Sequence, residues 1–113
     1  MPDARSRRIA DNESRFREIN ERLEADLRRL PSDDGPVEFV CECGHLECTA
    51  SVSLTVAEYE QVRGDSTTFA MVPGHQIEDV EDVVFANDRY QVARKKPPTW
   101  PIVTETDPRT DIG

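Results

Sequence analysis

All three cysteines of the chain lie within eight residues, at Cys41, Cys43 and Cys48, and a Pro-Gly-His run follows at Pro73–His75. Three thiolates and one imidazole are the ligands of a closed, tetrahedral structural zinc site, because soft sulfur and borderline nitrogen satisfy the ion and leave no open position. The sequence therefore predicts a structural zinc site with the ligands Cys41, Cys43, Cys48 and His75.

The fourth ligand has a rival in His45, which lies between Cys43 and Cys48. In that short loop the imidazole would have to fold back on the ion that its neighbours bind, so His75 is the favoured ligand. A different interpretation is that the three cysteines are small buried hydrophobic residues, since free cysteine is among the most buried residue types. Their clustering beside a glycine and a histidine favours the metal site.

The same cysteines allow a third interpretation, a thiol-based redox sensor. Cys41 and Cys43 could pair on oxidation, or oxidised thiolates could release the metal. The acidic neighbours Glu42 and Glu47 would raise the pKa of a free thiol, whereas a reactive thiol needs a lowered pKa. Structural zinc is therefore the preferred hypothesis.

Length and composition agree with a metal that supports folding. With 113 residues, 36% hydrophobic and 33% charged, the chain can form only one small core. A small core often needs additional cross-linking, and metal binding to a site absent from the unfolded chain contributes directly to folding free energy.

The formal net charge of −9 argues against nucleic-acid binding, because a basic surface is what a phosphate-binding protein shows first. No run of about 18 apolar residues is present, so we expect no membrane span. The first residues contain arginines but no apolar segment behind them, and three cysteines are an odd number, so we expect reduced thiols and a cytoplasmic location.

Residues 1–30 are predicted to form a long amphipathic helix, since apolar residues recur every seven positions at Ile9, Phe16, Leu23 and Leu30, widened by Ile19 and Leu27. The stripe either packs on the zinc-binding domain or binds a protein partner. We expect the C-terminal half to pack and the arginine-rich start to stay open to a partner. Residues 31–35 read as a polar hinge, and the oligomeric state is left open.

Residues 36–95 are predicted to form an α+β domain, a small antiparallel sheet with one short helix, fastened by zinc. Thr55 and Glu58 form a capping box for a helix over 56–63, and Gly44 lets the backbone turn beside the second thiolate. Alternating apolar residues predict strands at 37–41, 50–54 and 69–72 and a closing hairpin at 83–86 and 90–93, although Val80, Val83 and Val84 would also fit a helical turn.

Residues 96–113 read as a proline-rich, disordered or extended tail, because Pro97, Pro98 and Pro101 favour an extended backbone. Trp100 lies among them, followed by Ile102 and Val103. The tryptophan either is solvated or docks together with these neighbours, and we favour docking.

Several short motifs together resemble a family of small actinobacterial proteins of uncharacterised activity, over about residues 10–94. They are Phe16–Glu21, Cys41–Cys43, Cys48–Thr49, Ser53–Thr55, Glu58–Tyr59, Val62–Arg63 and Val72–His75. The resemblance implies that the three cysteines and the Pro-Gly-His recur as one signature, which strengthens the zinc prediction. No activity, enzymatic or other, follows from the resemblance.

The sequence shows no phosphate-binding glycine loop, no nucleophile elbow and no His-Glu-x2-His motif, so we expect a non-catalytic protein. The function predicted is that of a small cytosolic zinc-binding module for protein interaction or regulation, with a partner bound through the N-terminal helix. The alternatives are the redox sensor and a transcription-associated regulator that contacts polymerase or DNA through that helix.

Overall fold

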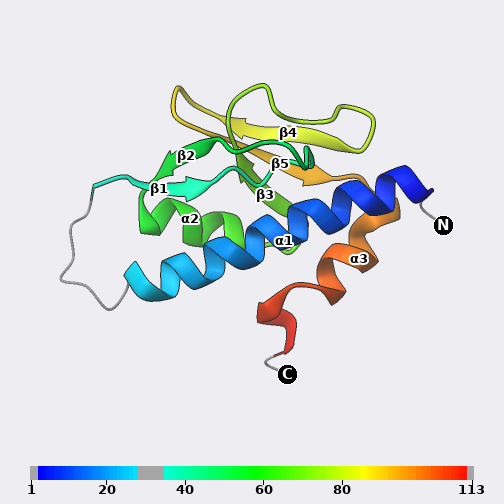
Figure 1. Cartoon of the computed structure of the whole chain (residues 1–113), viewed down its shortest axis with the longest axis horizontal. Helices are drawn as coiled ribbons and strands as arrows, with labels where there is room; N and C mark the ends of the chain where they lie inside the picture. Colours follow the sequence, from blue (N-terminus) through cyan, green and yellow to red (C-terminus); the bar gives the residue numbers. More distant parts are fainter. Residues whose placement is uncertain (1–2, 28–34, 112–113) are drawn as a thin grey trace.

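The computed structural model describes residues 3–27 and 35–111, and it confirms the predicted α+β class. The strands gather on one side of the molecule, while α1 and α3 run along the other (Figure 1). In chain order the elements are α1 (Ala4–Leu27), β1 (Val37–Val40), β2 (Ser51–Leu54), α2 (Val56–Arg63), β3 (Thr68–Met71), β4 (Glu81–Ala86), β5 (Gln91–Lys95), η1 (Pro97–Thr99), α3 (Trp100–Glu105) and η2 (Pro108–Asp111). Within the described ranges, no helix is both long enough and apolar enough to cross a bilayer.

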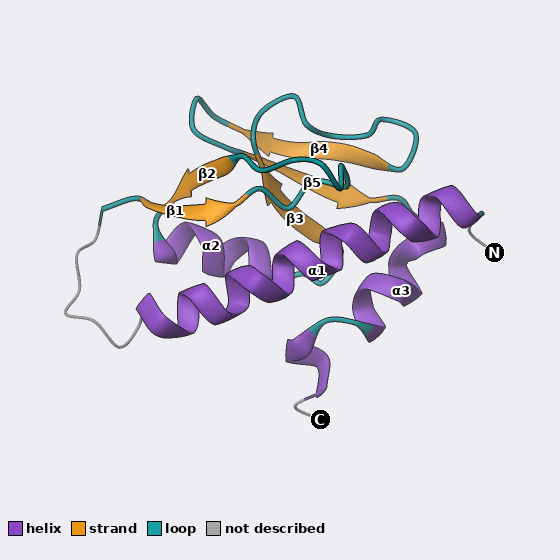
Figure 2. Cartoon of the chain, viewed as in Figure 1, coloured by secondary structure: helices purple, strands orange, loops and turns teal. Residues whose placement is uncertain are grey.

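The strands form two small antiparallel sheets where the sequence predicted one (Figure 2). β1 pairs with β2, from Val37 opposite Leu54 to Val40 opposite Ser51. The other sheet has the order β3-β5-β4, and its β4–β5 pair is the predicted closing hairpin, longer than expected at both outer ends. The amide of Glu42 donates to the carbonyl of Ala70 at 2.8 Å, so the chain beyond β1 is tied to β3.

Helix α2 begins with the predicted capping box. The Glu58 amide donates to Thr55 Oγ1 at 3.0 Å, and the Thr55 amide donates to Glu58 Oε1 at 2.8 Å. These two bonds satisfy amides that a helix start leaves without intrahelical partners, and they place the inner residues Tyr59 and Val62 in the core.

Two apolar clusters lie on opposite faces of the three-stranded sheet. The α2 cluster consists of Phe39, Val52, Leu54, Tyr59, Val62, Ala70, Tyr90 and Val92. The cysteine cluster consists of Ala10, Cys41, Cys43, Phe69, Met71, Ala93 and Val103. Two of the three cysteines therefore belong to the core beneath α1.

Helix α1 packs along more of its length than expected. Leu23 and Leu27 border the α2 cluster as predicted, but Ile9 and Ala10 near the helix start are also buried. Packing therefore extends beyond the C-terminal half that was predicted to pack. The arginines of the first turns are exposed, Ile19 is 49% exposed, and the predicted residues Leu30 and 31–34 lie outside the described ranges.

The buried face of α1 is mainly polar, which the apolar stripe did not predict. Glu13 and Arg17 are fully buried beside ionisable groups of distant elements: Lys95 Nζ lies 2.7 Å from Glu13 Oε1, and Arg17 Nη1 lies 3.9 Å from Asp107 Oδ2. The buried polar residues of the helix are Asn12, Glu13, Ser14, Arg17, Asn20 and Glu24.

The segment predicted to be a disordered or extended tail is folded. Val103 in α3 is fully buried, and its carbonyl accepts a 2.7 Å hydrogen bond from Arg17 Nη2. Trp100 docks in part, since its Nε1–H donates to the Lys95 carbonyl at 2.7 Å while its side chain stays 40% exposed. Prolines lie in the first positions of these short helices, where an amide N–H would have no intrahelical acceptor, so its absence in proline removes no hydrogen bond. The prolines therefore do not keep this segment extended.

Candidate metal centre

Two chain segments bring the four predicted ligands together. Cys41 and Cys43 follow β1, and the turn that places Cys48 is closed by its amide, which donates to the His45 carbonyl at 3.0 Å. His75 follows β3 in a second turn, whose Gly74 has a φ of 92°, a conformation that favours glycine. The Pro-Gly-His motif thus carries the histidine back to the cysteines.

The ligand atoms of Cys41, Cys43, Cys48 and His75 all lie within 4.8 Å of one another, which is close enough to hold a metal ion. His75 Nδ1 is 3.5 Å from Cys41 Sγ and 3.7 Å from Cys48 Sγ. A tetrahedral zinc ion with Zn–S of about 2.3 Å and Zn–N of about 2.0–2.1 Å would hold sulfur and nitrogen about 3.6 Å apart. The donor set and its spacing therefore fit zinc.

His45, the alternative fourth ligand, is not part of this group of four. Its ring centroid lies 6.4 Å from that of His75, and its side chain is exposed. The turn between the second and third cysteines directs this imidazole to solvent.

The protein groups around Cys41 favour its thiolate form. The amide of Val72 donates to Cys41 Sγ at 3.2 Å. The pKa of the Cys41 thiol is lowered by a hydrogen bond from Cys43 and by the Val72 amide, against the effect of burial. The same contact with Cys41, together with burial, raises the pKa of Cys43. Two thiolates this close repel each other, so Cys41 and Cys43 do not ionise together easily. A bound cation would offset the repulsion and stabilise both thiolates.

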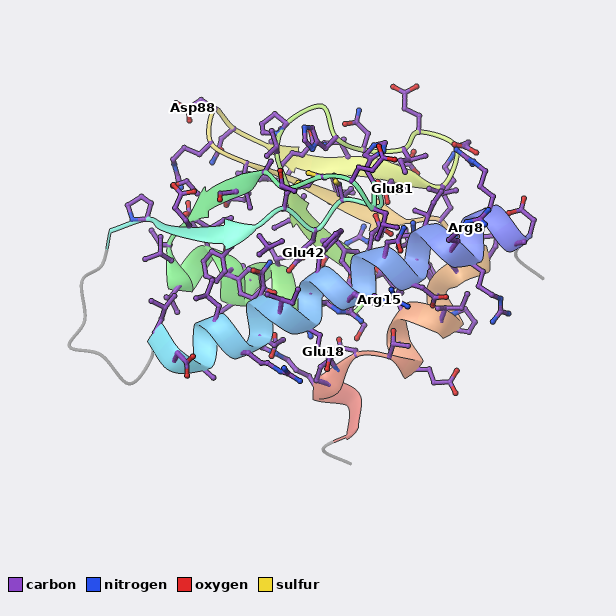
Figure 3. All side chains as sticks on the ribbon, viewed as in Figure 1. Arg8, Arg15, Glu18, Glu42, Glu81 and Asp88 are labelled. Carbon is purple, nitrogen blue, oxygen red and sulfur yellow. The ribbon has the colours of Figure 1, made fainter. Side chains whose placement is uncertain are left out.

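Glu42, between the first two cysteines, has a role that sequence reasoning missed. Its side chain is fully buried between α1 and the strands (Figure 3). Glu42 Oε2 accepts hydrogen bonds from Asn20 Nδ2 at 2.9 Å and from the Tyr59 hydroxyl at 2.6 Å, and Oε1 accepts one from the Ala70 amide at 3.0 Å. Burial raises its pKa, while these three donors oppose that shift. The carboxyl group fixes the backbone that carries Cys41 and Cys43.

Two asparagines of α1 hold the cysteine segment from the helix side. Asn20 bonds both backbone groups of Val40, with Nδ2 donating to the carbonyl at 2.7 Å and Oδ1 accepting from the amide at 2.8 Å. Asn12 Nδ2 donates to the Gly44 carbonyl at 3.1 Å. Nothing in the periodicity indicates these bonds, because an asparagine in a charged helix reads as surface.

Gly44 is needed for a different reason from the one predicted. Its φ is not positive, so it makes no turn that only glycine allows. A Cβ atom at this position would lie 2.4 Å from Ile9 Cγ2 and 3.2 Å from Ile77 Cδ1. The absence of a side chain lets α1 approach the cysteine loop closely.

Fold and site define an α+β protein whose Cys3His cluster could hold a metal ion. No protein-family model, curated protein or solved structure matches the chain. The actinobacterial resemblance stays a prediction.

Proposed function

We propose that the protein binds one zinc ion through Cys41, Cys43, Cys48 and His75, and that the ion has a structural role. The observation that carries this is the convergence of four suitable ligand atoms, within 4.8 Å, from two separate loops. The ion would join the segment after β1 to the segment after β3, which otherwise meet through few backbone bonds. Its binding energy would then be part of the folding energy.

A structural role is favoured over a catalytic one because four protein ligands complete a tetrahedral site, whereas a catalytic zinc keeps one position for water or substrate. It is also favoured over redox sensing, because Cys41 and Cys43 are buried and only Cys48 is partly accessible to an oxidant. We propose on these grounds a non-catalytic protein.

We further propose an interaction or regulatory role in the cytoplasm, since a small metal-stabilised domain without a catalytic position is suited to presenting a surface. The expected partner contact through α1 would use its outer face, where Arg5, Arg8 and Ile19 are exposed. Arg5 is already engaged by Asp79, at 3.3 Å between Nη2 and Oδ1.

X-ray absorption of the zinc-loaded protein tests the proposed coordination. We expect three sulfur neighbours at about 2.3 Å and one nitrogen at about 2.0–2.1 Å. In His75→Ala the nitrogen contribution should weaken or be replaced by oxygen, whereas His45→Ala should leave the spectrum unchanged. A spectrum with two histidines, or with oxygen in place of sulfur, would refute the assignment.

A further inference from the structure

The edge strand β4 exposes a run of large apolar side chains. β4 pairs with β5 on one side, and no strand in the described ranges pairs with its outer side. Val83, Val84 and Phe85 are 40%, 46% and 49% exposed, although they are consecutive residues of a strand. An exposed edge with apolar side chains is a site to which another extended chain can add.

A bulge in β4 creates an apolar groove beside this edge. Val83 lies opposite Ala93 and Phe85 lies opposite Val92, so Val84 is an additional residue on β4. In a regular strand Val84 and Phe85 would point to opposite faces, but the bulge brings both to one groove. The groove runs between β4 and α2, with an apolar floor formed by Val62, Val84, Phe85, Tyr90 and Val92 and a volume of about 280 Å³. That space accepts a single large apolar side chain.

Unpaired acidic side chains lie at both ends of the edge. Asp82, near the start of β4, and Asp88, just beyond its end, are exposed, and their carboxyl groups make no hydrogen bond or ion pair within the described ranges. Asp88 shares the field of its neighbour Arg89, whose guanidinium pairs with Glu58. Figure 3 shows Glu81 and Asp88 at opposite ends of this strand. On the rim of the groove itself, Glu58 pairs with Arg89 and Asp65 pairs with Arg94, so those charges are compensated.

We propose that β4 binds an extended basic peptide segment of another protein. The segment adds as a strand to the outer edge of β4 and places one apolar side chain in the groove. Lysine or arginine side chains at its two ends reach Asp82 and Asp88. A second copy of this chain is a poorer occupant, because each copy has a net charge of −9 and would bring acidic ends to acidic ends.

A peptide array tests this with the full-length, zinc-loaded chain. Each nonapeptide begins and ends with two lysines, and one threonine on each side separates them from three central residues. The central residues are varied among Val, Ile, Leu and Phe. One control set replaces the lysines with glutamates, and another places proline at the centre, where it removes a backbone donor. We expect lysine peptides to bind with a Kd below about 1 mM. Glutamate and proline peptides should bind at least about tenfold more weakly.

Matched variants locate the binding. Phe85→Asp should weaken the best lysine peptide by at least about tenfold, whereas Ile19→Asp, on α1 and also 49% exposed, should not. The double charge reversal Asp82→Lys and Asp88→Lys should transfer the preference to the glutamate peptides. Since Phe85 contacts the Tyr90 ring at 5.5 Å, Val84→Asp serves as the second variant if Phe85→Asp fails to fold.

Three outcomes would overturn the proposal. The first is an array in which no lysine peptide binds below about 1 mM. The second is lysine-peptide binding that the β4 variants leave unchanged. The third is a stable homodimer in solution that Phe85→Asp or Val84→Asp converts to monomer, since a second copy would then occupy the edge.

Discussion

The hydroxyl group of Tyr59, on α2, donates a 2.6 Å hydrogen bond to Oε2 of Glu42, the residue between the first two cysteines. Both side chains are fully buried, and the bond connects the helix that packs under β1 to the backbone of the candidate metal centre. The Tyr59 ring also stacks on Phe39, with centroids 4.5 Å apart. The packing of this region therefore depends on a polar contact as well as on apolar ones.

Tyr59→Phe should lower the free energy of unfolding by about 1–3 kcal/mol, because it removes one donor from a buried carboxyl group and keeps the ring stacking. Chemical denaturation of the zinc-loaded protein measures the loss. In a Glu42→Gln background the same substitution should cost less, since the two residues are coupled. Equal costs in both backgrounds would show that the bond contributes nothing.

Gly44→Ala should destabilise the protein by about 1–3 kcal/mol through overpacking against Ile9. The added Cβ would lie 2.4 Å from Ile9 Cγ2, so either α1 or the cysteine loop must move. Combining it with Ile9→Ala removes the clash, and the double variant should be less destabilised than the sum of the single variants. Strict additivity in thermal unfolding would contradict a direct contact.

Arg63→Met should cost about 3–5 kcal/mol, because it removes the guanidinium that bonds buried Asp107 directly and leaves Arg17, 3.9 Å away, as the nearest remaining cation. Arg63 bonds Asp107 directly, and its Nε lies 2.6 Å from Glu21 Oε1, which fastens the C-terminal segment to α1 and α2. Arg94→Met is the matched control. Its pair with Asp65 is about half exposed at 3.3 Å, so its loss should cost less than about 1 kcal/mol. Equal effects in denaturant titrations would refute the role of the buried pair.

The pH dependence of folding should report on Glu13. Burial and the neighbouring carboxyl group of Glu81 raise the pKa of Glu13 well above 4.5, and Lys95 opposes this shift. The folded state therefore retains a proton that the unfolded chain releases above pH 4.5. The contribution of Glu13 to the free energy of unfolding is full below pH 4.5 and falls as the pH rises from there towards the pKa of Glu13 in the folded state. Glu13→Gln cannot titrate.

The free energy of unfolding of the wild type and of Glu13→Gln is measured between about pH 5 and pH 8. Protonation of the cysteine and histidine ligands affects both proteins alike, so the difference between them reports on Glu13. The free energy of unfolding of Glu13→Gln should increase relative to that of the wild type as the pH rises. A difference that is constant, or that moves in the opposite direction, would show that Glu13 keeps an ordinary pKa.

Much of the fold follows from local patterns in the sequence. The capping box at Thr55 and Glu58 predicted α2 because its two hydrogen bonds are local. The spacing of the cysteines and the Pro-Gly-His motif identified four side chains that the structure brings together. Ligand type and spacing constrain such a cluster more strongly than they constrain the fold around it.

What the sequence did not predict depends on partners distant in the chain. Glu13 and Arg17 lie outside the predicted apolar stripe, and only the fold brings them to Lys95 and Val103. The C-terminal prolines predicted an extended chain, because local preference carries no information about the distant residues against which Val103 is buried. Long-range burial of charged residues has no periodic signal.

Native mass spectrometry of protein purified under reducing conditions tests the central claim most directly. We predict one zinc per chain for the wild type and for His45→Ala, with reduced occupancy in His75→Ala and in Cys41→Ser. Removal of the ion by a strong chelator should unfold the domain, because the ligands and their loops lose their shared partner. A wild-type chain without zinc, or occupancy that depends on His45 and not on His75, would contradict the account.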